Sequence, residues 1–453
     1  DDNEAKRGAA LGRVPVLMDT HKVGEYVQQY RVDEIIIAIA TPNGDLSELI
    51  HRCIDTGCHV RMVSTLRDVN TGAPALGRVR EVNIGDLLGR AEKHLDMTEV
   101  EAYFAGKRVL VTGGGGSIGS ELCRQIMSFT PAKLVLYDIS ENYMYDLFSE
   151  LKLLYGDALR QKLILCVGSI RDAQRLDEIF ARYRPEVVLH AAAHKHVPLM
   201  EDCPDQAVKN NVFGTWLTAQ AAVHHGVKRF VLISTDKAVN PTNVMGATKY
   251  LCEQVLQGLR HGSKTEFAAV RFGNVLGSSG SVIPLFKKQI AYGGPVTITD
   301  RRIVRYFMTI AEAVQLVLEA GSFARSGEVF VLDMGQPVYI RELAEKMICL
   351  SGLTPGVDIE IQEIGLRPGE KLYEELLISD KNLHRTENAK IFVEQRPEVG
   401  RNSMKEKLDR LRAAAESNDA ERMVALLHEI CPTFRTPEEV NREAEAAMQG
   451  AGV

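Results

Sequence analysis

The sequence lacks the features that mark a secreted, membrane-spanning or nucleic-acid-binding protein. It contains no apolar run of about eighteen residues, the length that a membrane helix needs. Its polar start has neither the basic residues nor the apolar stretch of a signal peptide. With a formal charge of −6 and scattered basic residues, it has no basic stripe for nucleic acid. We therefore expect this chain to be soluble, with no nucleic-acid partner.

Cysteine and histidine patterns give no sign of a metal site. The eight cysteines form no CxxC pair and lie far apart, mostly among apolar residues. Such spacing is typical of reduced, buried thiols in a reducing compartment. His190, His194 and His196 are close in sequence, but their spacing places them on no common face. We expect neither disulfides nor a bound metal.

Internal repeats and low-complexity tracts are also absent, and the chain instead alternates between apolar strands and helical segments. The intervening segments have helical patterns of ten to fifteen residues, which favours an α/β fold with a doubly wound parallel sheet of the Rossmann type. The expected strands are residues 108–112, 134–137, 163–167, 187–191, 230–234 and 267–271.

The first 90 residues show the same alternation on a smaller scale. Strands are expected at 35–40 and 59–63, with a helix at 46–53 between them. A unit of this kind normally opens with a strand and a glycine turn, whereas here a polar stretch leads directly into residues 14–17. We expect a truncated Rossmann-like domain from a longer protein. An intact small domain with a frayed start is the alternative.

A glycine-rich turn follows the strand at 108–112 and opens a helical run at 121–127. This strand, turn and helix context is what the dinucleotide fingerprint requires, because the glycines let the backbone approach a pyrophosphate at a helix N-terminus. The turn therefore predicts NAD or NADP. The residues expected at the cofactor are Gly113, Gly116, Ser117, Ile118 and Gly119.

Asp138 closes the second strand, about twenty residues beyond the glycines. A carboxylate there can accept hydrogen bonds from the adenosine ribose and would repel a 2′-phosphate, which favours NAD. Lys133 and Ser140 lie close in sequence and weaken this preference. Asp138 could instead cap the following helix.

Several segments together carry a resemblance to a known family. Residues 112–119, 191–193 and 234–237, with Asn211 and Lys249, resemble the extended short-chain dehydrogenase/reductase family. With the motifs at 271–278 and 367–371 added, residues 1–430 are similar to the long, CapD-like branch of UDP-N-acetyl-hexosamine 4,6-dehydratases. By family position the resemblance assigns further cofactor contacts to Ser140, Ser169, Ile170, Ala191, Ala192, Ala193, Asn211 and Lys249.

The resemblance implies a complete biochemical setting. The cofactor would be NAD, or NADP, held tightly and regenerated in each cycle, and the substrate would be UDP-GlcNAc or a related UDP-sugar.

The catalytic domain would span 91–402, with the cofactor part mainly at 106–275 and a smaller α/β substrate lobe mainly at 276–402. A helical extension, interrupted at Pro432, would follow at 403–453. We expect a homo-oligomer and, through membrane segments absent from this chain, a location at the cytoplasmic face of the bacterial inner membrane.

One position departs from the wider family. Where a YxxxK pair is usual, the chain has Met245 and Lys249, and a thioether cannot transfer a proton. Tyr250 would lie on the wrong helical face to substitute, and the long branch resembles this chain in having methionine. By family position, Thr235 is the candidate to take the C4 hydroxyl proton, through water and Lys249.

Asp236 and Lys237 follow the strand at 230–234, at the sheet edge where open α/β folds bind ligands. Their adjacency suits dehydration, with Lys237 removing the C5 proton and Asp236 protonating the departing C6 hydroxyl. This chemistry needs a neutral Lys237 and a protonated Asp236. We expect a partly desolvated pocket to shift both pKa values in those directions. A solvated turn is the alternative for this pair.

The UDP-sugar would need cations for its diphosphate and a polar pocket for the sugar. Arg305 and Arg367 are the expected phosphate ligands, although Arg305 could be a packing residue and Glu370 could mainly orient a cation. The full set of expected substrate contacts is Lys195, His196, Asn274, Ser278, Arg305, Arg367 and Glu370.

Two other functions remain open. An epimerase or reductase of UDP-sugars could share the cofactor turn, although it would normally keep the tyrosine and would have less use for Asp236 and Lys237. A catalytically inactive NAD(P)-binding scaffold is supported only by Met245.

Overall fold

The computed structural model describes residues 6, 8–17, 19–38, 46–63, 79–87, 96–374, 383–394, 400–417 and 419–450. These residues belong to two compact units that each draw on separate stretches of the chain. The first unit comprises Asp1–Lys93, Val282–Arg301 and Tyr339–Ile364, and the second comprises His94–Ser281, Arg302–Val338 and Gly365–Val453.

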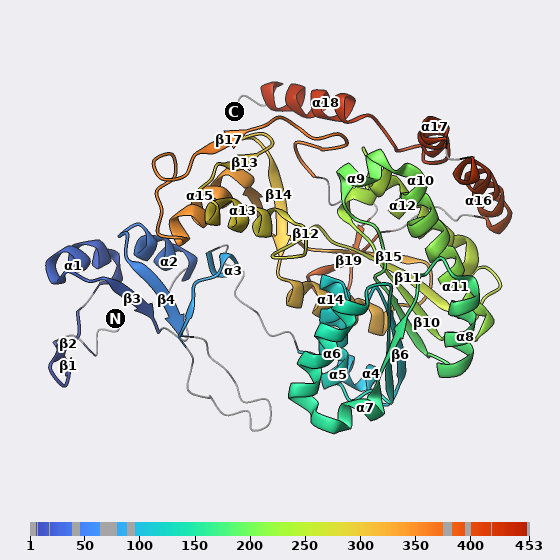
Figure 1. Ribbon diagram of the computed structural model, residues 1–453, viewed down its shortest axis with the longest axis horizontal. Helices are drawn as coiled ribbons and strands as arrows, with labels where there is room; N and C mark the ends of the chain where they lie inside the picture. Colours follow the sequence, from blue (N-terminus) through green and yellow to red (C-terminus); the bar gives the residue numbers. More distant parts are fainter. Residues whose placement is uncertain are drawn as a thin grey trace. The chain divides into compact units, whose positions relative to one another are not determined.

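A nine-stranded sheet forms the centre of the second unit (Figure 1). Seven neighbouring strands are parallel, in the order β15-β11-β10-β9-β6-β7-β8, and β19 and β18 extend the β15 edge antiparallel. The order reverses direction between β6 and β9, which is the switch point where doubly wound folds bind ligands. The strands are β6 (Arg108–Thr112), β7 (Lys133–Asp138), β8 (Leu163–Val167), β9 (Val187–His190), β10 (Arg229–Ile233), β11 (Glu266–Arg271), β15 (Glu328–Leu332), β18 (Leu383–Arg385) and β19 (Ile391–Glu394).

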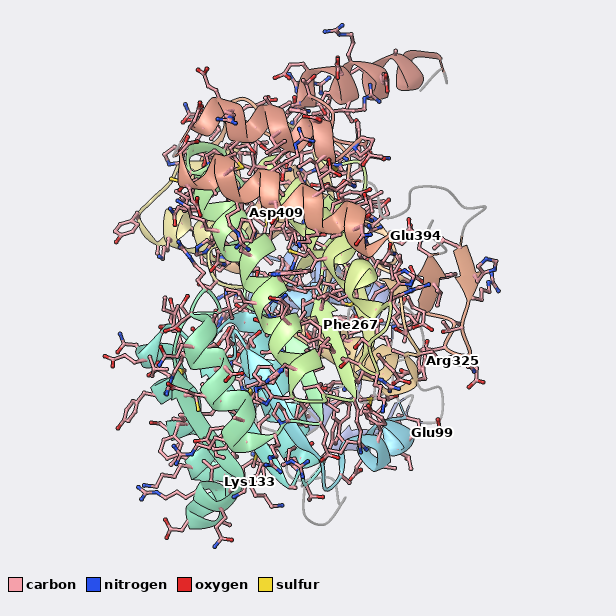
Figure 2. All side chains as sticks on the ribbon, turned by 90° about the vertical axis from the view of Figure 1, so that its right-hand side faces the viewer. Glu99, Lys133, Phe267, Arg325, Glu394 and Asp409 are labelled. Atoms are coloured by element: carbon pink, nitrogen blue, oxygen red, sulfur yellow. The ribbon has the colours of Figure 1, made fainter. Side chains whose placement is uncertain are left out.

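Apolar side chains on both faces of this sheet are buried, so the strands are hydrophobic throughout and two separate cores form. One core packs helices α4 (Thr98–Phe104), α5 (Ser117–Ser128), α6 (Glu141–Tyr155) and α14 (Ile310–Phe323). The other packs α8 (Ala173–Tyr183), α11 (Gly214–His224), α12 (Val244–Arg260), α16 (Arg401–Glu416) and α17 (Ala420–Ile430). Figure 2 labels Phe267 on the sheet and Asp409 on α16, which packs against α12.

Shorter elements line the ends of the strands and the outside of the unit. Residues 208–213, labelled η4 (Val208–Phe213), form a π-helix leading into α11, and η5 (Asp236–Ala238) is a single 3-10 turn after β10. A small sheet is ordered β12-β14-β16. The remaining elements are η3 (Gly156–Ala158), α7 (Leu159–Lys162), α9 (Val197–Asp202), α10 (Pro204–Ala207), β12 (Asn274–Val275), β14 (Val304–Met308), β16 (Pro337–Tyr339) and α18 (Pro437–Gly450).

A buried ion cluster joins three elements of the second unit. Arg271, at the end of β11, is 1% exposed and pairs with Glu253 of α12 at 2.6 Å and with Glu394 of β19 at 3.1 Å. Ser234, just after β10, donates to Glu253 Oε1 at 2.6 Å. Because each of these buried polar groups has a close partner, the cluster fixes the end of β10 against α12.

The first unit contains a three-stranded sheet in the order β3-β4-β5 and a parallel pair formed by β13 and β17. Its strands are β1 (Ala10–Leu11), β2 (Val14–Pro15), β3 (Glu34–Ile37), β4 (His59–Val63), β5 (Val79–Glu81), β13 (Val296–Ile298) and β17 (Ile361–Glu363). Its helices are η2 (Thr20–Lys22), α1 (Val23–Tyr30), α2 (Leu46–Ile54), α3 (Ile84–Leu87), α13 (Val282–Ala291) and α15 (Ile340–Leu350).

The predicted α/β class and parallel sheet are confirmed, with each expected strand found within a few residues of its predicted bounds. Residues 39 and 40 of the first expected strand lie outside the described residues. The domain boundaries stay a prediction; the compact units group 282–301 and 339–364 with the N-terminal region rather than with a separate lobe. In the described part of the chain, none of the helices combines the length and apolarity needed to cross a bilayer.

Candidate functional site

The glycine turn between β6 and α5 depends on close backbone approaches. Gly113 has φ of +67°, and a Cβ there would lie 2.5 Å from the backbone nitrogen of Ala192, in the loop after β9. A Cβ at Gly119 would lie 2.0 Å from the Gly113 carbonyl oxygen. Only glycine fits these two positions without moving backbone, so the turn packs α5 tightly against the ends of β6 and β9.

The N-terminus of α5 is available to an anion. Its N-cap residue, Gly116, makes no side-chain cap hydrogen bond, so the first N–H groups of the helix are left to solvent or a ligand. Ser117 Oγ accepts a hydrogen bond from the backbone N–H of Ser279 at 3.0 Å, and Ile118 packs partly buried against the core. An uncapped helix start reached by a glycine turn fits a pyrophosphate.

Asp138 lies beside this turn, at the end of β7. Its Oδ2 accepts from the Gly115 N–H and its Oδ1 from the Ser140 N–H, both at 2.8 Å. Ser140 is the N-cap residue of α6 and has no side-chain cap hydrogen bond, so Asp138 bonds to the N-cap residue and does not cap the first turn itself. The next strand end carries Ser169, whose carbonyl accepts from the Tyr137 hydroxyl, and the buried Ile170.

Replacing Gly119 with alanine should weaken NAD(P) binding about tenfold or more, because the new Cβ would clash with the Gly113 carbonyl and displace the turn. Isothermal titration with NAD and NADP measures the change. Gly24, in α1, has nothing within 4 Å of its Cβ position, so Gly24→Ala is the control and should bind normally. Equal NAD(P) affinity of the two variants would show that the turn is not part of the binding site.

The loop after β9 carries the expected cofactor residues Ala191, Ala192 and Ala193 and is held by Asn211 of the π-helix. Asn211 Oδ1 accepts from the His194 N–H at 2.8 Å, and its Nδ2 donates to the His194 carbonyl and to Thr248 Oγ1, both at 3.0 Å. Lys195 and His196 follow on the exposed part of the loop. Asn211 therefore fixes the backbone of the loop between β9 and α9.

His190 lies in the core, with its ring nitrogens 2.7 Å from Thr112 Oγ1 and 3.0 Å from Thr215 Oγ1. Burial, followed by the nearby charge of Lys249, lowers the pKa of His190 to about 3, so the ring is neutral at physiological pH. His194 and His196 are exposed on the loop. The three histidines form no common ligand set within the described residues.

Thr235, Asp236 and Lys237 meet directly after β10. Thr235 Oγ1 donates to Asp236 Oδ1 at 2.9 Å, and the Lys237 ammonium lies 3.0 Å from the same oxygen. Asp236 is 2% exposed, and among the described residues its Oδ2 has no hydrogen-bond partner. The sheet edge thus presents a hydroxyl, a carboxyl and an amine in a row. One of the carboxyl oxygens, Asp236 Oδ2, has no partner within the described part of the chain.

Glu374 completes this group, and the sequence pattern gave no reason to select it. Its Oε1 lies 3.3 Å from Lys237 Nζ and 3.7 Å from Arg305 Nε, and its side chain is 5% exposed. Burial raises the pKa of Glu374, but the cations Lys237, Arg305 and Lys371 lower it more, so the net shift is downward. Glu374 lies 137 positions after Lys237 in the sequence, so only the fold brings the two together.

The expectation for the charge of Lys237 was wrong. Burial lowers the pKa of Lys237, but the carboxylates of Asp236 and Glu374 raise it by more, so the net shift is upward. The expectation for Asp236 holds, because burial raises its pKa and Glu374 adds to this, against the opposing effect of Lys237. Lys237 is therefore an ammonium ion in this resting arrangement.

Met245 and Lys249 both lie on α12. Met245 is 4% exposed and packs within the hydrophobic core, so its thioether is a packing group. Lys249 Nζ donates to the Ile233 carbonyl at 2.6 Å, and burial lowers its pKa. Gly246 lets α12 approach the site closely, since a Cβ there would lie 2.2 Å from the Lys237 carbonyl oxygen.

Arg305 is 7% exposed, and its N–H groups already have partners. NH1 donates to the carbonyls of Val304 and Leu372, NH2 donates to the carbonyl of Lys371, and Glu370 Oε1 lies 3.4 Å from NH2. This matches the packing alternative for Arg305 and the cation-orienting alternative for Glu370 more closely than a free phosphate ligand.

The other expected substrate residues lie in different surroundings. Arg367 is exposed, on a loop tied to the α12 N-cap by bonds from Thr242 and Asn243 to the Gly369 carbonyl. Asn274 Oδ1 accepts from Lys237 Nζ at 3.4 Å, so its amide lies within the polar cluster. Ser278 is 6% exposed and accepts a backbone bond from Ser281.

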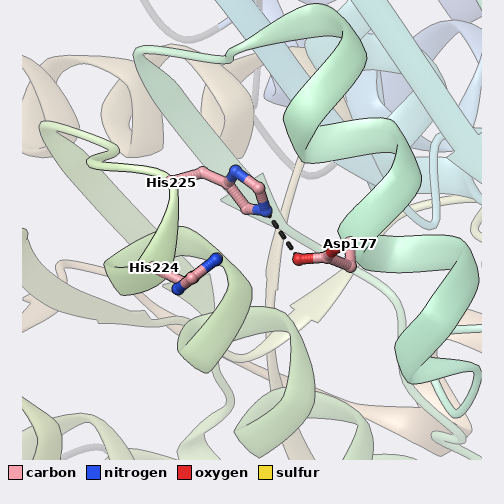
Figure 3. A group of neighbouring side chains, drawn as sticks. All are labelled: Asp177, His224 and His225. Carbon is pink, nitrogen blue, oxygen red and sulfur yellow. Dashed lines mark hydrogen bonds and ion pairs between the residues drawn. The ribbon is translucent and has the colours of Figure 1, made fainter.

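Away from the site, Asp177, His224 and His225 come together on α8 and the end of α11 (Figure 3). Their potential ligand atoms lie within 4.8 Å of one another. His225 Nε2 is 2.7 Å from Asp177 Oδ1, and its ring stacks on Phe180. The hydrogen bond and the ring packing account for the arrangement, so it supplies no argument for a metal.

Comparisons with known proteins bear on the family of this chain. A family described as polysaccharide biosynthesis protein matches residues 109–396. The probable polysaccharide biosynthesis protein EpsC of Bacillus subtilis is 47% identical over 381 residues, 83% of this chain and 63% of EpsC. The chain thus spans less than two thirds of that relative.

Two relatives are named by their reactions. A UDP-N-acetylglucosamine 4,6-dehydratase (inverting) of Campylobacter jejuni is 34% identical over 282 residues, which cover 61% of this chain and 79% of that protein. A UDP-glucose 4-epimerase of Rickettsia canadensis is 35% identical over 281 residues, with the same two shares.

Among solved structures, Pen from Bacillus thuringiensis is 35% identical and superposes with a TM-score of 0.60, over 66% of this chain and 92% of Pen. The doubly wound sheet, the glycine turn at its switch point and the matched region of 109–396 agree with one another. The chain belongs to the polysaccharide biosynthesis protein family and has the extended short-chain dehydrogenase/reductase fold.

Proposed function

We propose that this chain is a nucleotide-sugar 4,6-dehydratase that converts UDP-GlcNAc, or a related UDP-hexosamine, to the UDP-4-keto-6-deoxy sugar for bacterial surface glycans. One observation carries the proposal: Thr235, Asp236 and Lys237 form a hydrogen-bonded row at the carboxyl end of β10. This row provides a proton acceptor, an acid and an amine for the three proton transfers that the reaction needs.

The cofactor proposed for this reaction is NAD, with NADP as the alternative. The uncapped start of α5 would hold the pyrophosphate, and Asp138 would accept from the adenosine ribose. Bound there, the nicotinamide would accept the C4 hydride and return it to C6. Lys249, near the end of β10, is within the same site and is proposed to orient the ribose.

Thr235 and Asp236 supply a path for the C4 hydroxyl proton. A sugar hydroxyl donating to Thr235 Oγ1 can pass its proton along the 2.9 Å bond to the Asp236 carboxylate. Burial raises the pKa of Asp236, which makes its carboxylate a stronger base than an exposed one. A tyrosine is then not needed at position 245, where Met245 is a core residue.

Once C4 is a ketone, the C5 proton is acidic. The Lys237 amine takes this proton, the C6–O bond breaks, and Asp236 gives its proton to the departing hydroxyl, which leaves as water. Lys237 then returns a proton to C5. Asp236 therefore passes on the proton that it received from the C4 hydroxyl, and the substrate loses one water overall.

Exposed cations and polar groups are proposed to hold the UDP-sugar. Arg367 is solvent-exposed on its tight loop and can reach a diphosphate, while Lys195 and His196 lie exposed beyond the loop after β9. Arg305 is proposed to act on the substrate only indirectly, because its N–H groups hold the segment at 371–372.

The main rival is a UDP-sugar 4-epimerase, and one relative bears that name. Incubating the protein with UDP-GlcNAc and no added reductant, followed by mass spectrometry and NMR, separates the candidates. Loss of one water supports the dehydratase. Unchanged mass with inverted C4 supports an epimerase, and no product, despite NAD(P) binding, supports an inactive scaffold.

The proposal extends to the setting of the protein. EpsC is longer than the region it shares with this chain. We propose that a full-length form has membrane-anchoring segments that keep this part at the cytoplasmic face of the bacterial inner membrane, and that the chain works as a homo-oligomer. Membrane fractionation of the full-length protein and analytical ultracentrifugation of this chain test the two statements.

A further inference from the structure

Lys237 has more negative charge around it than a general base should have. Its Nζ lies 3.0 Å from Asp236 Oδ1, 3.3 Å from Glu374 Oε1 and 3.4 Å from Asn274 Oδ1. Both carboxylates are nearly inaccessible to solvent, at 1% and 5% side-chain exposure. An amine must be neutral to accept the C5 proton, so Lys237 must first give up a proton to one of its neighbours.

Asp236 cannot take that proton at the moment it is needed. On the path described above, Asp236 has already received the C4 hydroxyl proton through Thr235, and it must keep this proton for the departing C6 hydroxyl. Asn274 offers an amide oxygen, which is too weak a base. Glu374 is the remaining acceptor on Lys237 among the described residues, with its Oε1 3.3 Å from Nζ. Its lowered pKa keeps it ionised at rest. Protonation of Asp236 removes the largest charge that raises the pKa of Lys237, which favours proton transfer to Glu374.

Arg305 holds Glu374 in this position. Its NH1 and NH2 donate to the carbonyls of Leu372 and Lys371, and its Nε lies 3.7 Å from Glu374 Oε1. The segment that ends at Glu374 is therefore fixed to β14. The charged groups around Lys237 are Asp236 from η5, Arg305 from β14, and Glu374 with Lys371 from this segment.

We propose that Glu374 is a positioning residue that takes the ammonium proton of Lys237 before C5 is deprotonated and returns it afterwards. This inference rests on the proposed dehydratase function. The proposed cycle starts with Asp236 and Glu374 as carboxylates and Lys237 as an ammonium. After Asp236 accepts the C4 hydroxyl proton, an N–H bond of Lys237 breaks and an O–H bond forms on Glu374.

The remaining transfers balance. The C5–H bond breaks as Lys237 gains that proton, and the C6–O bond breaks as Asp236 protonates the leaving water. Lys237 protonates C5 of the product, and Glu374 then protonates Lys237. Every group returns to its resting state, and the proton that leaves with water is the one first held by the C4 hydroxyl.

Glu374→Gln tests the proposal because it removes the acceptor and keeps the shape. At neutral pH, kcat for dehydration should fall about 10²-fold with little change in KM. Solvent must then remove the Lys237 proton, so kcat should rise with pH in the variant while the wild-type profile stays level. Glu374→Asp keeps a carboxylate and should recover most of the activity.

Glu394→Gln is the matched control. Glu394 is also a buried carboxylate paired with an arginine, but its partner Arg271 belongs to the core cluster. This variant should lose stability in urea unfolding while keeping the wild-type pH profile. A Glu374→Gln enzyme with the wild-type kcat and pH profile would overturn the role of Glu374.

A second readout needs no turnover. NMR titration of side-chain-labelled lysine, with Lys237 assigned through Lys237→Arg, should give a lower pKa for Lys237 in Glu374→Gln than in the wild type, because one neighbouring negative charge is gone. An unchanged pKa of Lys237 would show that Glu374 does not interact with it and would overturn the proposal. If the wild type fails to dehydrate UDP-GlcNAc while this pKa does fall, the proposed function fails and the pairing stands.

Discussion

Replacing Lys237 with methionine is expected to lower kcat for UDP-GlcNAc dehydration about 10²- to 10⁴-fold, the range typical of a lost general base. Methionine keeps much of the side-chain volume but cannot accept the C5 proton. The change also removes the ammonium that lies 3.0 Å from Asp236 and 3.3 Å from Glu374. UDP affinity should be nearly unchanged, because the proposed role of Lys237 is at the sugar rather than at the nucleotide.

Two measurements make this result specific. Exchange of the C5 proton with deuterated solvent should disappear in Lys237→Met, since no amine remains to remove it. Lys405 is exposed on α16 of the same compact unit and is not among the groups assigned to the site, so Lys405→Met serves as the control for a lost lysine charge and should turn over normally. Solvent exchange at C5 that continues at the wild-type rate would exclude Lys237 as the base.

Replacing Thr235 with valine is the second large effect that we expect. Valine has the same shape but no hydroxyl, so the path from the sugar to Asp236 Oδ1 is cut. Oxidation at C4 should fall about 10²-fold or more, while NAD(P) remains bound. Stopped-flow absorbance of the reduced nicotinamide, with isothermal titration of the cofactor, separates the two effects.

Thr235→Ser restores the hydroxyl and should restore most of the rate. If Thr235→Val oxidised the sugar as fast as the wild type, the C4 proton would have to leave by another route. Met245 would not supply it, because its side chain is buried in the core and has no transferable proton.

Much of the fold could be predicted from the sequence because its signals are local. The apolar strands that form β6 to β11 are each continuous in sequence, and the glycines at 113–119 lie directly between a strand and a helix. The row of Thr235, Asp236 and Lys237 could be predicted equally well, since three consecutive residues after a buried strand must lie at the same sheet edge.

The electrostatics of the site could not be read from the sequence in the same way. Lys237 was expected to have a lowered pKa from burial alone, and the opposite shift comes from the carboxylate of Asp236 and, after it, from the carboxylate of Glu374. The contact between Lys237 and Glu374 joins residues 137 positions apart. It depends on Arg305 of β14, which holds the segment at 371–372 next to Glu374. Long-range ion pairs of this kind leave no spacing pattern.

Arg305 is a second residue whose contacts could not be predicted from the sequence. An arginine near the sheet edge has the chemistry to bind a diphosphate, but the strand that carries it places the guanidinium against the carbonyls of Lys371 and Leu372. Its chemistry was therefore predictable and its partners were not. Arg367 lies on an exposed loop, and its contact with the diphosphate stays a prediction.

The most direct test of the account follows the hydride itself. UDP-GlcNAc carrying deuterium at C4 should give a product with the deuterium in its C6 methyl group and one water lost, with no net reduction of the cofactor. This result would show that the hydride leaves C4 and returns to C6 of the sugar. Deuterium retained at C4, or released while reduced cofactor accumulates, would contradict the proposed dehydration.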